Sequence, residues 1–136
     1  MEWDDQWMVV NSQTVAPLEK DLLWSICMVP SHGQIAPINQ IMYTLLYRSF
    51  GFNPLAFHIA FLVIHFINIC LLFIGLRIIL HDCTEIPAKR IKWIVAITTV
   101  LFAIHPLQVE SVAWISASKI LLSTMFYFAG AINQRK

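Results

Sequence analysis

Charged side chains are scarce in this sequence: they make up 12% of its 136 residues, against about 25% in a typical soluble domain. The formal net charge is only +1, so no broad basic field exists and nucleic acid is not an expected partner. Only four glycines occur, and no phosphate-cradling glycine loop is found. The three cysteines are an odd number without a CxxC pair, which argues against a disulfide framework.

Hydrophobic residues are abundant where charge is missing. They make up 58% of the sequence, which is more than the core of one small domain needs. The composition therefore predicts an integral membrane protein that crosses the bilayer more than once, with membrane lipids as partners.

The longest apolar run covers residues 55–77. Leu55 to Leu76 carry no formal charge when the histidines are neutral, and about 20 apolar residues in a helix span the hydrocarbon core of a bilayer. Pro54 precedes the run and Arg77 closes it. The sequence predicts a transmembrane helix over residues 55–77.

Two shorter runs predict further crossings. The run over residues 91–105 becomes long enough if basic side chains snorkel at one end, and Pro106 should end or kink the helix at the other. The third stretch contains polar residues and leaves two alternatives. Either a surface helix over residues 106–118 precedes a truncated span over residues 119–134, or one helix has a polar shoulder. The predicted fold class is an all-α membrane protein with about three transmembrane helices.

Basic residues orient these predicted spans. They concentrate in and beside the loop over residues 78–90 and at the end of the chain. The positive-inside rule places these segments in the cytoplasm. Residues 1–54 and 106–118 then face the outside. The basic residues in or beside these two segments are Arg77, Lys89, Arg90, Lys92, Arg135 and Lys136.

Residues 1–54 lack the basic start and apolar stretch of a signal peptide. Two amphipathic helices are predicted there, over residues 17–28 and 37–50, lying on the outer membrane surface. The alternative is a soluble cap that packs on itself. Because the chain would begin on the outer side without a preceding span, we expect it to be a fragment. The apolar side of the second predicted helix is formed by Ile38, Ile41, Met42, Leu45 and Leu46. Its opposite side carries Asn39, Thr44 and Arg48.

Several polar residues are candidates for chemistry. Asp4-Asp5 could bind a metal or supply a general base, or be a solvated acidic turn. His58 and His65 are seven residues apart and share a helix face. They would contact a lipid phosphate or form a proton path, or make interhelical hydrogen bonds.

The densest cluster of polar residues follows the second predicted span. His105, Glu110 and Lys119 near one outer loop could together bind an anionic headgroup and a sugar hydroxyl. The alternative is an interfacial loop with a snorkelling lysine.

Two segments resemble motifs of one known family. Residues 101–123 read LFAIHPLQVESVAWISASKILLS, similar to the signature HPxHxESVAWxxxRKDxLS of polytopic proteins in the GT-C glycosyltransferase superfamily, usually followed by tetratricopeptide repeats. Residues 36–68 are similar to their FGxNPxxFHxxNxxxHxxN segment, and Asp4-Asp5 to the acidic pair that opens their first outer loop. Bacterial members resemble the animal transmembrane, tetratricopeptide-repeat-containing O-mannosyltransferases.

The resemblance implies a partial GT-C fold and a mechanism. A mannose-like sugar on a polyprenyl phosphate would pass, with inversion, to a protein or glycan hydroxyl on the non-cytoplasmic face. Asp4 or Asp5 would be the general base. No cofactor is indicated, because such enzymes often need no metal, although some members use a divalent one. The membrane would be the bacterial inner membrane, or the endoplasmic reticulum in a eukaryote. The residues expected to bind the sugar or the lipid phosphate are His105, Glu110, Lys119, Arg48, His58 and His65.

The chain departs from the family pattern at two charged positions. Ala36 stands where the family often has arginine, and Ile120 stands where the signature has a charged residue. Two alternatives to the enzyme therefore remain. The chain could be a non-catalytic membrane anchor or assembly module of a tetratricopeptide-repeat protein, or a transporter fragment in which His58 and His65 form a proton relay. We expect the fragment alone to be inactive.

Overall fold

The computed structural model describes residues 36–51, 53–83, 86–114 and 117–134. In these ranges every regular element is a helix, which confirms the predicted all-α class. The elements are α3 (Pro37–Phe50), α4 (Pro54–Cys83), α5 (Ala88–Ile104), α6 (Pro106–Ala113) and α7 (Ser118–Asn133).

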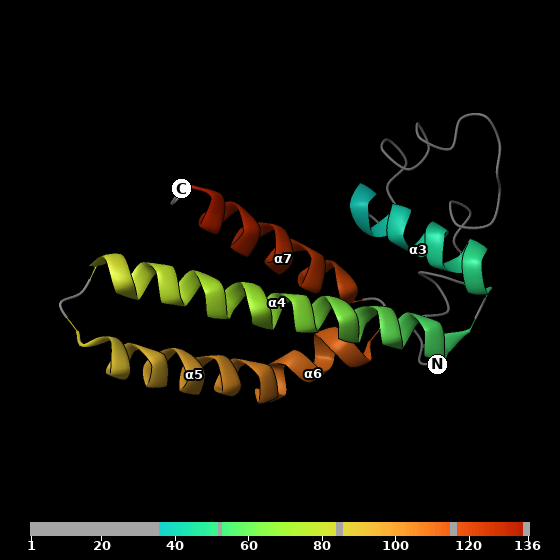
Figure 1. Ribbon diagram of the computed structural model, residues 1–136. Coiled ribbons are helices and arrows are strands. Elements are labelled where there is room, and N and C mark those ends of the chain that lie inside the picture. The colour runs from blue at the N-terminus through green and yellow to red at the C-terminus, as the bar shows by residue number, and fades with distance from the viewer. Residues whose placement is uncertain (1–35, 52, 84–85, 115–116, 135–136) are drawn as a thin grey trace.

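Helix α4 is the axis of the molecule (Figure 1). Helices α5 and α6 lie along one side of it, α7 lies along another, and α3 packs near its N-terminal end. Helix α7 runs in the same direction as α4, because Asn68 contacts Leu121 and Gly75 lies beside Ile132 further along both helices.

Helix α4 is long and apolar enough to cross a membrane. Its 30 residues measure about 45 Å at 1.5 Å per residue, more than the hydrocarbon core requires. The helix does not end at Arg77, as the apolar run suggested, but continues to Cys83. No glycine or proline lies between Arg77 and Cys83, and the long Arg77 side chain can reach away from the apolar surface.

Fewer candidate spans are found among the described residues than the three crossings that the sequence predicts. In the part of the chain that the structure describes, α4 is one candidate span, and α5 with α6 form a second only if the bent pair counts as one span. Helix α7 has 16 residues, fewer than the roughly 20 that a crossing needs. Three transmembrane helices are therefore not confirmed.

The chain bends by 51° between α5 and α6. His105 has extended backbone angles and Pro106 opens α6, as expected of a residue that cannot continue the hydrogen-bond ladder. Helix α6 ends at Ala113, and the next helix, α7, begins at Ser118. This division matches the two-helix alternative for the third stretch, while the position of α6 at a membrane surface stays a prediction.

Helix α3 forms at the predicted residues but turns its polar side inward. The buried residues of α3 are Asn39, Gln40, Tyr43 and Thr44. The predicted apolar side points outward, with Leu45 65% exposed and Ile38 51% exposed. An outward apolar side suits a helix against lipid, and the place of α3 at the outer membrane surface stays a prediction. The helix predicted over residues 17–28 lies outside the described residues.

Candidate functional site

One half of the helix bundle gathers most of the predicted site residues. Helix α3, the N-terminal part of α4, α6 and the start of α7 meet there (Figure 1). These elements carry Arg48, His58, Glu110 and Lys119, and His105 lies where α6 begins. Asp4 and Asp5 lie outside the described residues, so their position relative to this half stays a prediction.

A buried polar network holds α3 against the first turn of α7. The Ser118 hydroxyl is fully buried and donates to Asn39 Oδ1 at 2.9 Å. Its oxygen also lies 2.6 Å from the Tyr43 hydroxyl. Because a serine hydroxyl has a single proton, Tyr43 is the donor in the second bond. The network fixes the backbone next to Lys119.

These three network residues were not expected from the sequence as site residues. Asn39 and Tyr43 are four positions apart, so they share one face of α3, but their partner Ser118 is far away in the chain. Only the spacing of Asn39 and Tyr43 could have suggested a polar contact face.

Lys119 lies in an open groove of about 180 Å³ between α3 and α7. Ala36, Pro37 and Asn39 line the α3 side of this groove, and Ser123 lines the α7 side. The position at which the family often has arginine therefore faces the same groove as Lys119. The groove keeps one cation despite that departure.

His105 and His65 line a second open groove, of about 240 Å³. His105 Nδ1 accepts a hydrogen bond from the Leu107 backbone N–H at 3.3 Å and so caps α6. Its ring is otherwise exposed. The groove is mainly apolar, and Gln108 is its other polar side chain.

The residues of the densest polar cluster are found at different places on the described helices. His105 and Lys119 line different grooves, and Glu110 lines neither of them. Glu110 is exposed on α6 and Arg48 is exposed in the last turn of α3. That these three residues bind one ligand together stays a prediction.

His65 packs between helices, while His58 is half-buried. The His65 ring stacks on Phe102, with centroids 6.1 Å apart, and its Nε2 lies 3.3 Å from the Ala103 carbonyl oxygen. Asn68, one turn further along α4, donates to the Leu121 carbonyl oxygen at 3.0 Å. These contacts correspond to the interhelical hydrogen bonds that were the alternative to a phosphate contact.

Three buried side-chain polar atoms of α4 and α5 have no hydrogen-bond partner among the described residues. They are His65 Nδ1, Asn68 Oδ1 and Thr99 Oγ1. Each such atom costs free energy unless a water or another polar group reaches it. Thr99 gave no signal in the sequence, because one threonine in an apolar run is ordinary.

Metal-binding side chains are dispersed in the described part of the chain. Its His, Cys, Asp and Glu residues nowhere form a group of three that could hold a metal ion.

The described helices define an all-α protein with one or two candidate membrane spans and a polar site in one half. The chain is similar to human protein O-mannosyl-transferase TMTC1, with 25% identity over 142 residues and 98% of this chain. It is also similar to Drosophila melanogaster Tmtc1, at 25% identity over 94% of this chain. Mouse TMTC3 is 27% identical over 78% of it.

These similarities support the resemblance found in the sequence motifs. The chain spans only 15%, 14% and 10% of the three relatives, respectively. No family model matches the chain, and no solved structure matches it.

Proposed function

We propose that this chain is part of a membrane glycosyltransferase. It would help to transfer a mannose-like sugar from a polyprenyl-phosphate carrier to an acceptor hydroxyl on the non-cytoplasmic face of the membrane. The observation that carries the proposal is the similarity to proteins named as O-mannosyl-transferases over nearly the whole chain. The part of the chain covered by this similarity includes the stretch around His105 that resembles the family signature.

The residues would divide the chemistry between them. Asp4 or Asp5 would take the proton of the acceptor hydroxyl as general base. Lys119, His105 and Arg48 would offer positive charge or a hydrogen bond to the leaving phosphate. Glu110 and His58 would contact the sugar or its carrier. The groove of Lys119 supports this assignment, since its cation is held beside a rigid buried network.

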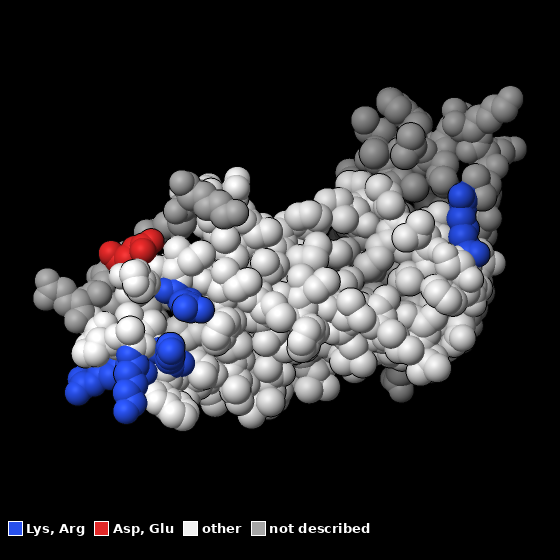
Figure 2. Space-filling model, in the orientation of Figure 1, with Lys and Arg blue, Asp and Glu red and all other residues white. Residues whose placement is uncertain are grey.

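The charge distribution supports placing this chemistry outside the cytoplasm. Helix α3, α6 and the start of α7 lie away from the end where α4 passes to α5, and that end carries most of the Lys and Arg side chains of the described residues (Figure 2). Under the positive-inside rule the basic end is cytoplasmic, so the candidate site faces outward.

The test is transfer of labelled sugar in membranes containing the protein at its natural length. We expect product with a polyprenyl-phosphate mannose donor, and none in matched membranes without the protein. If no donor of several sugars gives product while the protein is present and folded, a non-catalytic anchor becomes the better account. Ala36 and Ile120 would then mark the lost charges.

Two substitutions separate the ligand role of His105 from its cap role. His105→Asn keeps an oxygen that can cap α6, whereas His105→Ala removes the cap at a cost of about 1 kcal/mol. If the ring contacts the leaving phosphate, both variants should lose transfer by about 10²-fold. The measurement is initial rate at equal protein level. Wild-type rates in His105→Asn would restrict the residue to capping.

A further inference from the structure

The buried sides of α4 and α5 face each other. The two helices run antiparallel (Figure 1), and α5 packs mainly on α4. The buried residues of α5 are Ile91, Val95 and Thr99, which are four positions apart and so share one helix face. His65 of α4 reaches α5 one turn beyond Thr99, because its Nε2 lies 3.3 Å from the Ala103 carbonyl oxygen.

The unpartnered polar atoms His65 Nδ1, Asn68 Oδ1 and Thr99 Oγ1 belong to one level of this interface. Asn68 is about one turn after His65 on α4, and Thr99 is about one turn before Ala103 on α5. In antiparallel helices these two steps go the same way along the bundle. One turn is about 5.4 Å, and two groups that bond to one water can be up to about 6 Å apart, since each bond is about 3 Å long.

The three atoms together need two hydrogens and supply one. The Ala103 carbonyl only accepts, so His65 Nε2 carries the hydrogen and the neutral ring leaves Nδ1 as an acceptor. Asn68 uses its amide nitrogen to donate to the Leu121 carbonyl oxygen, and its Oδ1 is a second acceptor. The Thr99 hydroxyl has one hydrogen, so it can satisfy only one of them. A water molecule has two hydrogens and can also accept one.

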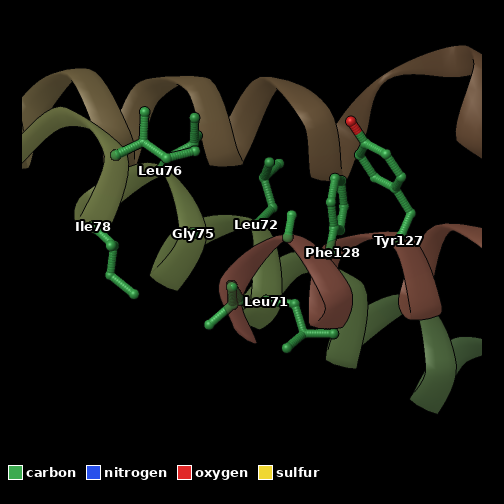
Figure 3. A pocket seen from close by; sticks show the side chains of 10 residues that line it. Leu71, Leu72, Gly75, Leu76, Ile78, Tyr127 and Phe128 are labelled. Atoms are coloured by element: carbon green, nitrogen blue, oxygen red, sulfur yellow. The ribbon is translucent and has the colours of Figure 1, made fainter. Parts of the chain in front are cut away.

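The described residues around these atoms are largely apolar. The Phe102 ring stacks on His65 and packs edge-on against Phe128. The neighbouring groove of about 200 Å³ between the C-terminal halves of α4 and α7 is lined by apolar side chains and Tyr127 (Figure 3). In such surroundings an unpaired polar atom is costly. His65 also lines the open groove that it shares with His105, so one member of the set borders a space that opens to the surface.

We propose that one internal water molecule binds between α4 and α5 at this level. It would donate one hydrogen to His65 Nδ1 and the other to Asn68 Oδ1, and it would accept the hydrogen of the Thr99 hydroxyl. About three hydrogen bonds are typical of a buried water. Binding of this water does not depend on sugar transfer, so its tests measure hydration and stability alone.

The direct test uses the full chain in lipid bilayers, with isotope-labelled histidine and asparagine. Solid-state NMR spectra are recorded in which only nuclei that receive magnetisation from water give a signal. We expect a signal from His65 Nδ1 and from the Asn68 amide nitrogen, although both side chains are buried. No signal from His65 Nδ1 in the folded wild type would overturn the proposal. A signal from His65 without one from Asn68 would indicate a direct bond between Thr99 and His65, and would overturn it too.

The stability of Thr99→Val gives a second test, in which the sign of the change decides. If Thr99 holds the water, losing the hydroxyl leaves the water short of a partner and should lower the folding equilibrium constant about tenfold. If the hydroxyl has no partner, the same change removes an unpaired buried group and should raise that constant. A denaturant titration in detergent micelles measures it. An unchanged or raised constant would contradict the proposal.

Two matched variants complete the test. Thr98→Val makes the same replacement at the adjacent, exposed position, and should change the folding equilibrium constant by no more than about twofold. Thr99→Ser keeps the hydroxyl and should keep the signal from water at His65 Nδ1, which Thr99→Val should lose. Equal signals in Thr99→Val and the wild type would remove Thr99 from the site and overturn the three-bonded water. The wild-type spectra test the proposal even where a variant does not fold.

Discussion

If Asp4 or Asp5 is the general base, as proposed, replacing that residue with asparagine is expected to reduce sugar transfer by about 10²-fold or more. Asparagine keeps the size of the side chain but cannot take a proton from the acceptor hydroxyl. One of Asp4→Asn and Asp5→Asn should show this loss, and the double variant should show it too. The measurement is the initial rate of labelled sugar transfer in membranes, at equal protein level.

Asp21→Asn is the matched control for this change. It removes a carboxylate of the same type from the same N-terminal stretch, at a residue with no proposed role, and should transfer at the wild-type rate. If the double variant Asp4→Asn/Asp5→Asn keeps that rate as well, the general base is elsewhere. Glu110 is then the next carboxylate to replace, because it belongs to the segment that resembles the family signature.

Of the substitutions considered for α3, Tyr43→Ala is expected to lower the free energy of unfolding most. The Tyr43 side chain is fully buried, its ring centroid lies 6.3 Å from that of Phe57, and its hydroxyl bonds to Ser118. Removing a buried aromatic ring costs about 3–5 kcal/mol. The loss should detach α3 from α4 and α7, because Tyr43 contacts both. Protease cleavage within α3, and the denaturation midpoint in detergent micelles, would measure it.

Two further substitutions in α3 separate the contribution of the Tyr43 ring to stability from that of its hydroxyl and from that of an exposed side chain. Tyr43→Phe keeps the ring and removes only the hydroxyl, so it should cost about 1 kcal/mol. Leu45→Ala shortens a side chain that is 65% exposed and should change stability by no more than about 0.5 kcal/mol. A Tyr43→Ala variant no less stable than Leu45→Ala would mean that α3 is held by other contacts.

Features that depend on local sequence could be predicted. The uninterrupted apolar run after Pro54 produced the long helix α4, and Pro106 produced the bend between α5 and α6. Pro37 begins α3, where its missing N–H costs nothing. Proline sterics and helix length act within a few residues, so one stretch of sequence is enough to predict them. The end of α4 was predicted too early, because charge at Arg77 limits an apolar run without breaking a helix.

Contacts between distant residues were decided by the tertiary structure. The sequence grouped His105, Glu110 and Lys119 by their nearness in the chain, but the break before α7 sends His105 and Lys119 to different grooves. In the tertiary structure Lys119 shares a groove with Ala36, and His105 shares one with His65. These pairings depend on how helices pack, which local sequence does not encode.

The sequence by itself determined that this protein is helical, rich in apolar surface and basic at one end. Only the tertiary structure decided which side of α3 is buried. Amphipathic periodicity favours burial of its apolar side, yet Asn39 and Tyr43 turn inward because Ser118, 79 and 75 positions away, completes their hydrogen bonds. A buried polar group is stable only with a partner, and that partner comes from another helix.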